Sequence, residues 1–296
     1  MEKYFTIEEA MKGKCAFMTG GTSGIGRSTV ETFVQAGIDV VFVGRNEKAG
    51  REEEAALNAL GKGRALFMPC DVSDFPKLEE TVRKAIAHFG RLDILFNCAG
   101  IFPPQRPADE WSLDEFMEVM NTNFIAYFVA IRTALPELRR TKGVILNVGS
   151  VVGQLGDEGA CAYTAAKGAI ACMTKTIAID EARHGVRCVE IKPGNIVTGM
   201  LEKTCEEVGD KSFMQYSDSL QWFNRGGRPD EVARAALFLA SPWASFVTGT
   251  DLLVSGGFEI GEGPKPINPY LESNKDAAGG PLYPDQRPLE DWAKHR

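Results

Sequence analysis

The stretch Cys15-Ala-Phe-Met-Thr-Gly-Gly-Thr-Ser-Gly-Ile-Gly26 decides the fold. Its first five residues, Cys15–Thr19, form an apolar run of the length that is typical of a buried strand. A glycine-rich turn follows directly, and the pattern predicts a helix over residues 24–36. A strand that passes through such a turn into a helix is the opening unit of a Rossmann-type, doubly wound α/β fold.

Short β-branched runs alternate with longer amphipathic stretches along the rest of the chain. Strands are expected at residues 40–43, 65–69, 92–97, 144–148, 186–191 and 252–254. Helices are expected at residues 47–60, 74–89 and 161–183, and from about residues 112 and 229. This alternation predicts one parallel sheet covered by helices on both faces, in a single domain over residues 1–260. Residues 261–296 are rich in Pro and Gly and predict an extended or disordered tail.

Charge and composition argue against several classes of protein. The net charge of −7 disfavours a nucleic-acid partner, because such a partner needs a basic surface. The seven cysteines contain no CxxC pair and the three histidines lie far apart, which favours free thiols and disfavours a metal centre. The N-terminus has no apolar signal core, and no apolar stretch is long enough to span a bilayer. We therefore expect a cytoplasmic protein with no membrane partner.

The glycine-rich turn predicts a site for a dinucleotide pyrophosphate. Gly20, Gly24 and Gly26 allow a tight turn and a close backbone approach, and the helix start offers free N–H groups. The spacing differs from GxGxxG, and without its flanking strand and helix such a turn is often only a loop. Asp71, after the third strand, is a candidate acceptor for the adenine amino group, or a turn residue. Residues 97–100 and 193–198 end two more strands at the carboxyl edge, where ligands bind in such sheets.

Tyr163 and Lys167 are four residues apart in an expected helix and therefore share one face. An ammonium beside a phenol is expected to lower the phenol pKa from about 10, which makes Tyr163 a candidate general acid or base. Ser150 follows the fifth strand, where its hydroxyl can hold a substrate oxygen. Asn123 lies in the preceding helix and is a candidate anchor for a water relay to Lys167. A lone Tyr-x-x-x-Lys pair is often only an exposed helix pair, so the order of all these motifs carries the prediction.

Over residues 14–257 the sequence resembles the short-chain dehydrogenase/reductase family. The matching motifs are TGGTSGIG at 19–26, Asp71-Val72, NCAG at 97–100, Asn123, Ser150, YTAAK at 163–167 and PGNIVT at 193–198. The resemblance implies an NAD(P)-dependent oxidoreductase acting on CH–OH groups, with a catalytic tetrad of Asn123, Ser150, Tyr163 and Lys167. It also implies a homotetramer or homodimer. Cys98 stands where the family often has a second Asn.

The resemblance further implies that Lys167 binds the nicotinamide ribose and that Thr198 holds the carboxamide. The residues expected to bind the dinucleotide are Gly20, Thr22, Ser23, Gly24, Ile25, Gly26, Arg45, Asp71, Val72, Asn97, Ala99, Gly100, Tyr163, Lys167, Pro193, Gly194, Ile196 and Thr198. Within the family, residues 103–107, 192–198 and 249–263 are most similar to members related to 17β-hydroxysteroid dehydrogenase type 14 and to L-fucose dehydrogenases.

The end of the second strand, Val43-Gly44-Arg45-Asn46, bears on the choice of cofactor. An NAD-dependent enzyme usually places a carboxylate here to bind the ribose hydroxyls, and Gly44 has no side chain to do so. The Arg45 guanidinium matches a 2′-phosphate. We therefore expect NADP(H), with NAD(H) as the alternative if Arg45 is only a solvated surface residue.

Residues 101–108, 154–162 and a lid at 199–228 are expected to wall the substrate pocket. The lid carries apolar side chains, which either contact the substrate or only pack the lid: Met200, Leu201, Phe213, Met214, Tyr216, Trp222 and Phe223. Its acidic residues disfavour a highly phosphorylated substrate: Glu202, Glu206, Glu207 and Asp210. A steroid-like or other hydrophobic alcohol or ketone is expected first, then a sugar such as L-fucose, then a 3-oxoacyl thioester. An NADP-binding regulator without turnover is the non-enzyme alternative, and the intact tetrad argues against it.

Overall fold

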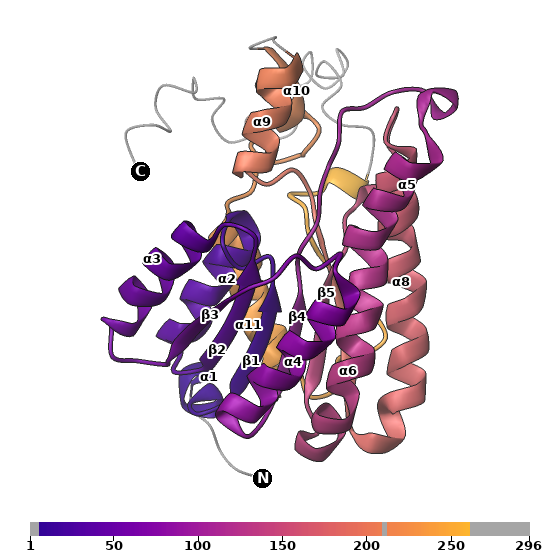
Figure 1. Ribbon diagram of the computed structural model, residues 1–296. Helices are drawn as coiled ribbons and strands as arrows, with labels where there is room; N and C mark the ends of the chain where they lie inside the picture. The colour runs from indigo at the N-terminus through magenta and orange to yellow at the C-terminus, as the bar shows by residue number, and fades with distance from the viewer. Residues whose placement is uncertain (1–5, 209–211, 261–296) are drawn as a thin grey trace, which may run out of the picture.

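Seven parallel strands form one sheet in the order β3-β2-β1-β4-β5-β6-β7. The computed structural model describes residues 6–208 and 212–260, so the predicted tail lies outside the described residues (Figure 1). The strands are β1 Cys15–Thr19, β2 Asp39–Gly44, β3 Ala65–Pro69, β4 Ile94–Asn97, β5 Val144–Val148, β6 Arg187–Pro193 and β7 Asp251–Val254. The predicted doubly wound parallel sheet is confirmed.

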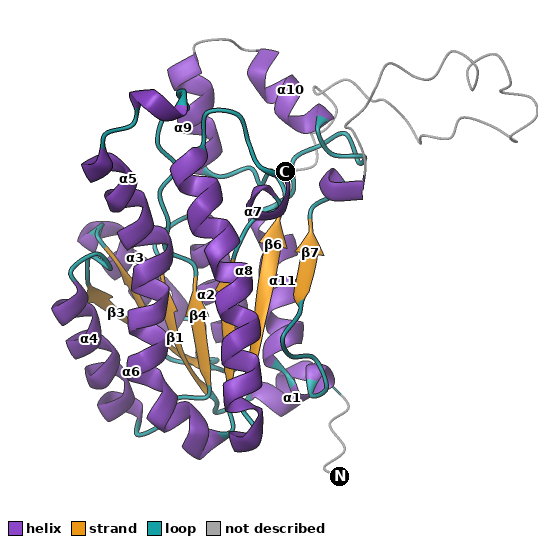
Figure 2. Cartoon of the chain, turned by 90° about the vertical axis from the view of Figure 1, so that its right-hand side faces the viewer, coloured by secondary structure: helices purple, strands orange, loops and turns teal. Residues whose placement is uncertain are grey.

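Helices cover both faces of the sheet (Figures 1 and 2). One face packs against α2 Gly24–Gln35, α3 Glu47–Asn58 and α11 Pro229–Ala240. The other packs against α4 Phe75–Phe89, α6 Ala126–Thr141 and α8 Cys161–Glu181. Two hydrophobic clusters result, one on each side of the sheet. The central strands are buried on both faces, which is why they read as continuous apolar runs rather than alternating ones.

Local capping chemistry sets several helix boundaries where the sequence predicts them. Asn46 accepts a hydrogen bond from the backbone of Ala49 at 3.1 Å and begins α3. Asp74 begins α4 in the same way, and Pro76 sits in the first turn of that helix. Helix α4 ends at Gly90, which has a φ of +71° that side chains other than glycine rarely adopt.

The long helix expected from about residue 112 is interrupted, which the sequence analysis did not predict. Helix α5, Leu113–Met120, passes into a π-helical turn at Asn121–Ile125 before α6 begins. The turn holds Asn123, whose side chain bonds to a neighbouring strand-end loop. Insertions of this kind are frequent at functional sites. Two short helices were also missed: α1 Ile7–Met11 and α7 Val152–Leu155.

A chain of buried polar side chains ties the middle strands to α8. The Asn97 amide donates to Asn147 Oδ1 at 2.9 Å, and the Asn147 amide donates to Thr174 Oγ1 at 3.0 Å. All three side chains are buried, so these bonds replace bonds to water. They fix the carboxyl ends of β4 and β5 against α8, the helix that carries Tyr163 and Lys167.

The predicted lid contains two helices, α9 Gly199–Val208 and α10 Ser212–Ser219, which lie beyond the carboxyl edge of the sheet (Figure 1). Within the described part of the chain, no helix combines the length and the apolar content that crossing a membrane requires.

Candidate active site

A cavity of about 1050 Å³ opens at the carboxyl edge of the sheet. Its walls come from the β1–α2 turn, the ends of β4, β5 and β6, and helices α8, α9 and α10. The strand order reverses between β1 and β4, so the helices that follow these strands diverge to opposite faces. Such a switch point leaves a crevice at the carboxyl edge, where α/β proteins of this topology bind ligands.

The glycine-rich turn forms one end of the cavity. Gly20 has a φ of +70°, and a Cβ on it would lie 2.8 Å from Ala99 Cα. A Cβ on Gly26 would lie 2.0 Å from the Gly20 carbonyl oxygen. Side chains at these positions are therefore excluded by their neighbours. Ser23 begins α2 without a side-chain capping bond, which leaves the first N–H groups of the helix for a ligand. This shape fits a dinucleotide pyrophosphate.

Lys167 is buried at the centre of the predicted catalytic residues. Its Nζ donates to the Val148 carbonyl at 2.8 Å, at the end of β5. The same nitrogen lies 5.5 Å from the centroid of the Tyr163 ring and 5.7 Å from that of Tyr127. Phe102 packs edge-on against Tyr163, with ring centroids 4.8 Å apart. The ammonium and the phenol are thus enclosed by aromatic rings and strand ends.

Burial shifts the pKa values of both groups toward their uncharged forms. Loss of water raises the pKa of Tyr163 to about 12, while a hydrogen bond with Ser150 acts in the opposite direction. Loss of water also lowers the pKa of Lys167 to about 8. The expected lowering of the Tyr163 pKa by the Lys167 ammonium stays a prediction, since in the ligand-free protein the loss of water is the largest effect and the net direction is upward. Tyr163 keeps its proton at neutral pH and can donate it.

Asn123 is fully buried and is bonded to the loop after β4. Its Oδ1 accepts from the Ile101 amide at 2.8 Å, and its Nδ2 donates to the Ile101 carbonyl at 2.9 Å. These two bonds hold Gly100 beside Lys167, since a Cβ on Gly100 would lie 3.9 Å from Lys167 Nζ. The water relay expected at Asn123 stays a prediction.

The structure brings most of the predicted site residues to the cavity. The predicted residues that line it are Gly20, Ser23, Gly24, Ile25, Gly26, Ala99, Gly100, Ser150, Tyr163, Lys167, Pro193, Gly194, Ile196 and Thr198. The predicted residues outside its lining are Thr22, Arg45, Asp71, Val72, Asn97 and Asn123. Thr22 packs against Gly44, and the Asn97 side chain points to β5. Asp71 Oδ1 accepts both the backbone and the hydroxyl hydrogen bond of Ser73.

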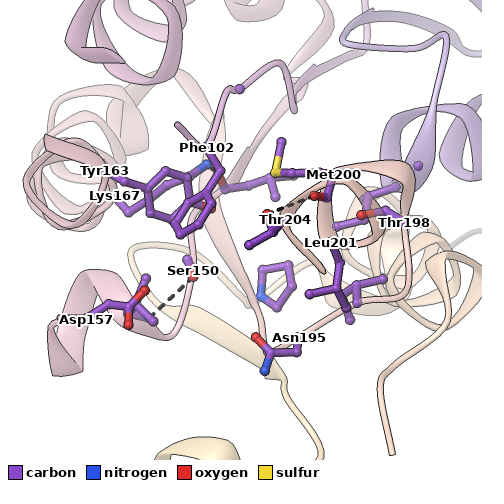
Figure 3. A pocket seen from close by; sticks show the side chains of 18 of the residues that line it. Phe102, Ser150, Asp157, Tyr163, Lys167, Asn195, Thr198, Met200, Leu201 and Thr204 are labelled. Carbon is purple, nitrogen blue, oxygen red and sulfur yellow. Dashed lines mark hydrogen bonds between the residues drawn. The ribbon is translucent and has the colours of Figure 1, made fainter. Parts of the chain in front are cut away.

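Figure 3 shows side chains that line the cavity and labels Phe102, Ser150, Asp157, Tyr163, Lys167, Asn195, Thr198, Met200, Leu201 and Thr204. Residues of all three segments that were predicted to wall the substrate pocket therefore line this cavity. The side chains of Glu206, Glu207, Asp210, Phe213 and Met214 lie outside the described residues.

Two residues of the site, Tyr127 and Asp157, were not predicted from the sequence. The four-residue spacing from Asn123 was a signal for Tyr127, whereas Asp157 depends on the folding of its loop.

Comparisons with known proteins agree with this arrangement. A family model described as enoyl-(acyl carrier protein) reductase matches residues 20–259. L-fucose dehydrogenase of Mus musculus is 41% identical over 254 residues, which cover 86% of this chain and 91% of that protein. 2,5-Dichloro-2,5-cyclohexadiene-1,4-diol dehydrogenase of Sphingobium indicum is 36% identical over 84% of this chain and 98% of its own length.

A solved structure shares the fold as well. Ligand-free aldohexose dehydrogenase of Thermoplasma acidophilum has a TM-score of 0.76 and 30% identity, and the match covers 87% of this chain and 97% of that one. Together with the sequence relatives, this shows that the chain belongs to the short-chain dehydrogenase/reductase family. It is an oxidoreductase of that family, and the predicted resemblance to L-fucose dehydrogenases is confirmed.

Replacing Lys167 by Met is expected to abolish turnover and to stabilise the ligand-free protein at pH 7. The folded pKa of about 8 lies below the ordinary 10.5, so the buried ammonium costs stability below pH 8. In wild type this cost is relieved as the pH rises from 8 toward 10.5, because there the unfolded chain binds more protons. Urea unfolding should give a gain for Lys167→Met on the order of 2 kcal/mol at pH 7, shrinking at pH 9.

Lys175→Met is the matched control, since Lys175 is exposed on the same helix and should leave stability and turnover nearly unchanged. A Lys167→Met protein that is less stable than wild type at pH 7 would contradict this account of the buried ammonium.

Proposed function

We propose that this protein oxidises one hydroxyl of a sugar or another small polyol, or reduces the matching carbonyl, with NADP(H). The observation that carries the proposal is the meeting of Ser150, Tyr163 and Lys167 with the glycine-rich turn in one cavity, where Asp157 adds a carboxylate. A bound nicotinamide dinucleotide supplies or accepts the hydride. The protein supplies the proton, the orientation and the electrostatic environment.

Ser150 and Tyr163 have different roles toward the substrate oxygen. Ser150 and Tyr163 hydrogen-bond the oxygen of the reacting carbon, and Tyr163 delivers a proton to it in the reductive direction. Its raised pKa keeps that proton in place until negative charge develops on the oxygen. In the oxidative direction the phenolate form of Tyr163 takes the proton and becomes the phenol. The positive charge of nearby Lys167 stabilises that phenolate before the transfer.

Polar groups on the substrate side of the cavity support a polyol. Gln105 Nε2 donates to Asp157 Oδ2 at 3.1 Å, which joins two loops across the pocket. Asp157 is exposed as a residue, and the partial burial of its carboxyl, ahead of all other effects, raises its pKa. A carboxylate with free lone pairs accepts hydrogen bonds from hydroxyl groups. Two relatives named above act, by their names, on sugars, which supports the same class.

A hydrophobic alcohol, such as a steroid, is the second candidate, although the sequence alone favoured it. Its support is a set of apolar residues that line the same cavity: Phe102, Met200, Leu201, Leu220 and Phe258. Sugars also stack on apolar and aromatic surfaces, so these side chains accommodate either class. The carboxylate of Asp157 has no evident use toward a steroid ring, which is why we now place the polyol first.

The end of β2 supports NADP(H) over NAD(H). A Cβ on Gly44 would lie 2.6 Å from Thr22 Oγ1, so an acidic side chain at this position is sterically disfavoured. The next residue, Arg45, is exposed and directly follows Gly44, which packs against Thr22 of the glycine-rich turn. Its positive charge reaches Asp71: burial raises the pKa of Asp71, but bonds from Ser73 and the charge of Arg45 together leave it lowered. The Arg45 guanidinium is therefore available to bind the 2′-phosphate of NADP(H).

Exposed apolar side chains support assembly into a homo-oligomer. They are Ile179 on α8, Leu253 on β7 at the open edge of the sheet, and Trp243 and Phe246 just before that strand. The cytoplasmic location stays a prediction.

Substrate class is tested by turnover of Asp157→Asn on sugars and on simple secondary alcohols. Loss of the carboxylate should lower kcat/KM for sugars by about 10- to 100-fold, because a charged hydrogen bond to a second hydroxyl is lost. Simple secondary alcohols should be affected far less. Asp109→Asn, an exposed change outside the cavity lining, is the control. Wild-type turnover of steroid-like alcohols with none of any sugar would overturn the polyol assignment.

Cofactor choice is tested by titrating wild type and Arg45→Ala with NADPH and NADH. The variant should bind NADPH about 10- to 100-fold more weakly and NADH nearly unchanged, since only the 2′-phosphate contact is removed. Lys48→Ala removes an exposed positive charge from the first turn of α3 and controls for general electrostatics. Tighter binding of NADH than of NADPH by wild type would show that the missing carboxylate at Gly44 does not exclude NAD(H).

A further inference from the structure

Two buried charged side chains and one half-buried carboxylate meet behind the catalytic serine, and the reaction described above does not use them. Glu190 and Lys192 on β6 are only 2% and 6% exposed, and Asp251 on β7 is 26% exposed. Lys192 Nζ lies 3.8 Å from Glu190 Oε2 and 3.5 Å from Asp251 Oδ2. The register explains the meeting, because Glu190 pairs with Asp251 across neighbouring strands.

The shortest polar contact of the Lys192 ammonium leads toward the active site. Its Nζ donates to Gln154 Oε1 at 3.1 Å, whereas both carboxylates lie beyond 3.4 Å. Gln154 belongs to α7, the short helix that begins two residues after Ser150. A buried cation with two carboxylate neighbours thus holds the far end of the segment whose near end is the catalytic serine.

The rest of that segment is fixed at backbone level. Gly149 N donates to the Ile191 carbonyl at 2.8 Å and Val151 N donates to the Pro193 carbonyl at 3.2 Å, which tie Ser150 to β6 on both sides. Val152 N donates to Ser150 Oγ at 3.3 Å. The helix α7 itself is one turn long and too short to be stable alone, so it needs a tertiary anchor. The Lys192–Gln154 bond is such an anchor.

Glu190 packs between Lys192 and the backbone beside Ser150. A Cβ on Gly149 would lie 1.8 Å from Glu190 Oε1, so the carboxylate packs directly against the backbone beside Ser150. That oxygen is buried without a hydrogen-bond partner among the described residues. Burying the Glu190 carboxylate and the Lys192 ammonium, with Asp251 half-buried beside them, is costly unless these charges neutralise one another. A cluster of this kind is poor evidence for stability, which makes a role in positioning the site the better explanation.

We propose that Lys192 is a positioning residue: held between Glu190 and Asp251, it fixes Gln154 and with it the segment 150–155 that presents Ser150 to the substrate. The assignment rests on the proposed role of Ser150 in turnover. It does not depend on which alcohol is the substrate or on which dinucleotide is bound.

The test compares Lys192→Met, Gln154→Met and the double variant. Each single change should lower kcat by about 10-fold or more, because small displacements of a group that orients the substrate are costly. Binding of the dinucleotide should be nearly unchanged, since its phosphates meet the β1–α2 turn. If both changes act through one contact, the double variant should lose no more activity than Lys192→Met alone. Gln154→Glu keeps an acceptor for the ammonium and should retain most of the activity.

Hydrogen exchange supplies a readout that needs no turnover. The amides of residues 151–155 should exchange faster in Lys192→Met and Gln154→Met than in wild type. Lys14→Met is the matched control: Lys14 pairs with the buried Asp93 at 3.2 Å at the opposite edge of the sheet, so its loss should leave that segment and kcat unchanged. Gln154→Met leaves the charges of Glu190, Lys192 and Asp251 in place, so it decides the question even if Lys192→Met does not fold.

Two results would overturn the proposal. One is unchanged exchange at residues 151–155 in Gln154→Met, and the other is faster exchange there with kcat unaltered. If wild type turns over no alcohol or carbonyl at all, the proposed function fails, and the exchange data still decide whether Lys192 fixes the segment.

Discussion

The active site depends on one buried hydrogen bond, from the Lys167 ammonium to the Val148 carbonyl at 2.8 Å. It joins α8 to the carboxyl end of β5. Because Tyr163 lies one helical turn before Lys167, and Ser150 lies two residues after Val148, this single contact brings the phenol and the hydroxyl to the same place. The buried bonds from Asn97 to Asn147 and from Asn147 to Thr174 join β4 and β5 to the same helix at a second point. These contacts fix α8 against the sheet and thereby fix the positions of Tyr163 and Ser150.

The dryness of this region explains its chemistry. Lys167 is buried and Tyr163 is half-buried, and this loss of water lowers the pKa of Lys167 and raises that of Tyr163. Burial also raises the pKa of Glu190, to about 7, and the negative charge of Asp251 raises it further. The positive charges of Lys192, Lys167 and Lys175 lower it. The site thus holds several ionisable groups in a medium that disfavours their charged forms. Perturbed pKa values of this kind cluster at functional sites, where enzymes accept some loss of stability.

Much of this could be read from the sequence, for reasons that are local. Strands buried on both faces are continuous apolar runs, and residues such as Asn46 and Asp74 mark helix starts by their own hydrogen bonds. Tyr163, Lys167 and the glycine-rich turn also follow from spacing, because one helix face and one backbone turn set their geometry. Features that depend on distant packing were not predicted. The Asn123 side chain in the π-helical turn bonds to the Ile101 backbone, and Gln154 of α7 bonds to Lys192 on β6. The upward effect of burial on the pKa of Tyr163 was also not predicted, because a charged neighbour is visible in a sequence whereas loss of water is not.

In the proposed function, Tyr163 transfers the proton while the glycine-rich turn binds the dinucleotide independently of it. The most direct test is Tyr163→Phe, measured for dinucleotide affinity and for turnover on the best alcohol of the wild type. The account predicts nearly unchanged affinity together with a fall in kcat of about 100- to 10,000-fold, the range that a general acid–base contributes. A variant that binds the dinucleotide and keeps most of its turnover would contradict the account and would require a different proton donor.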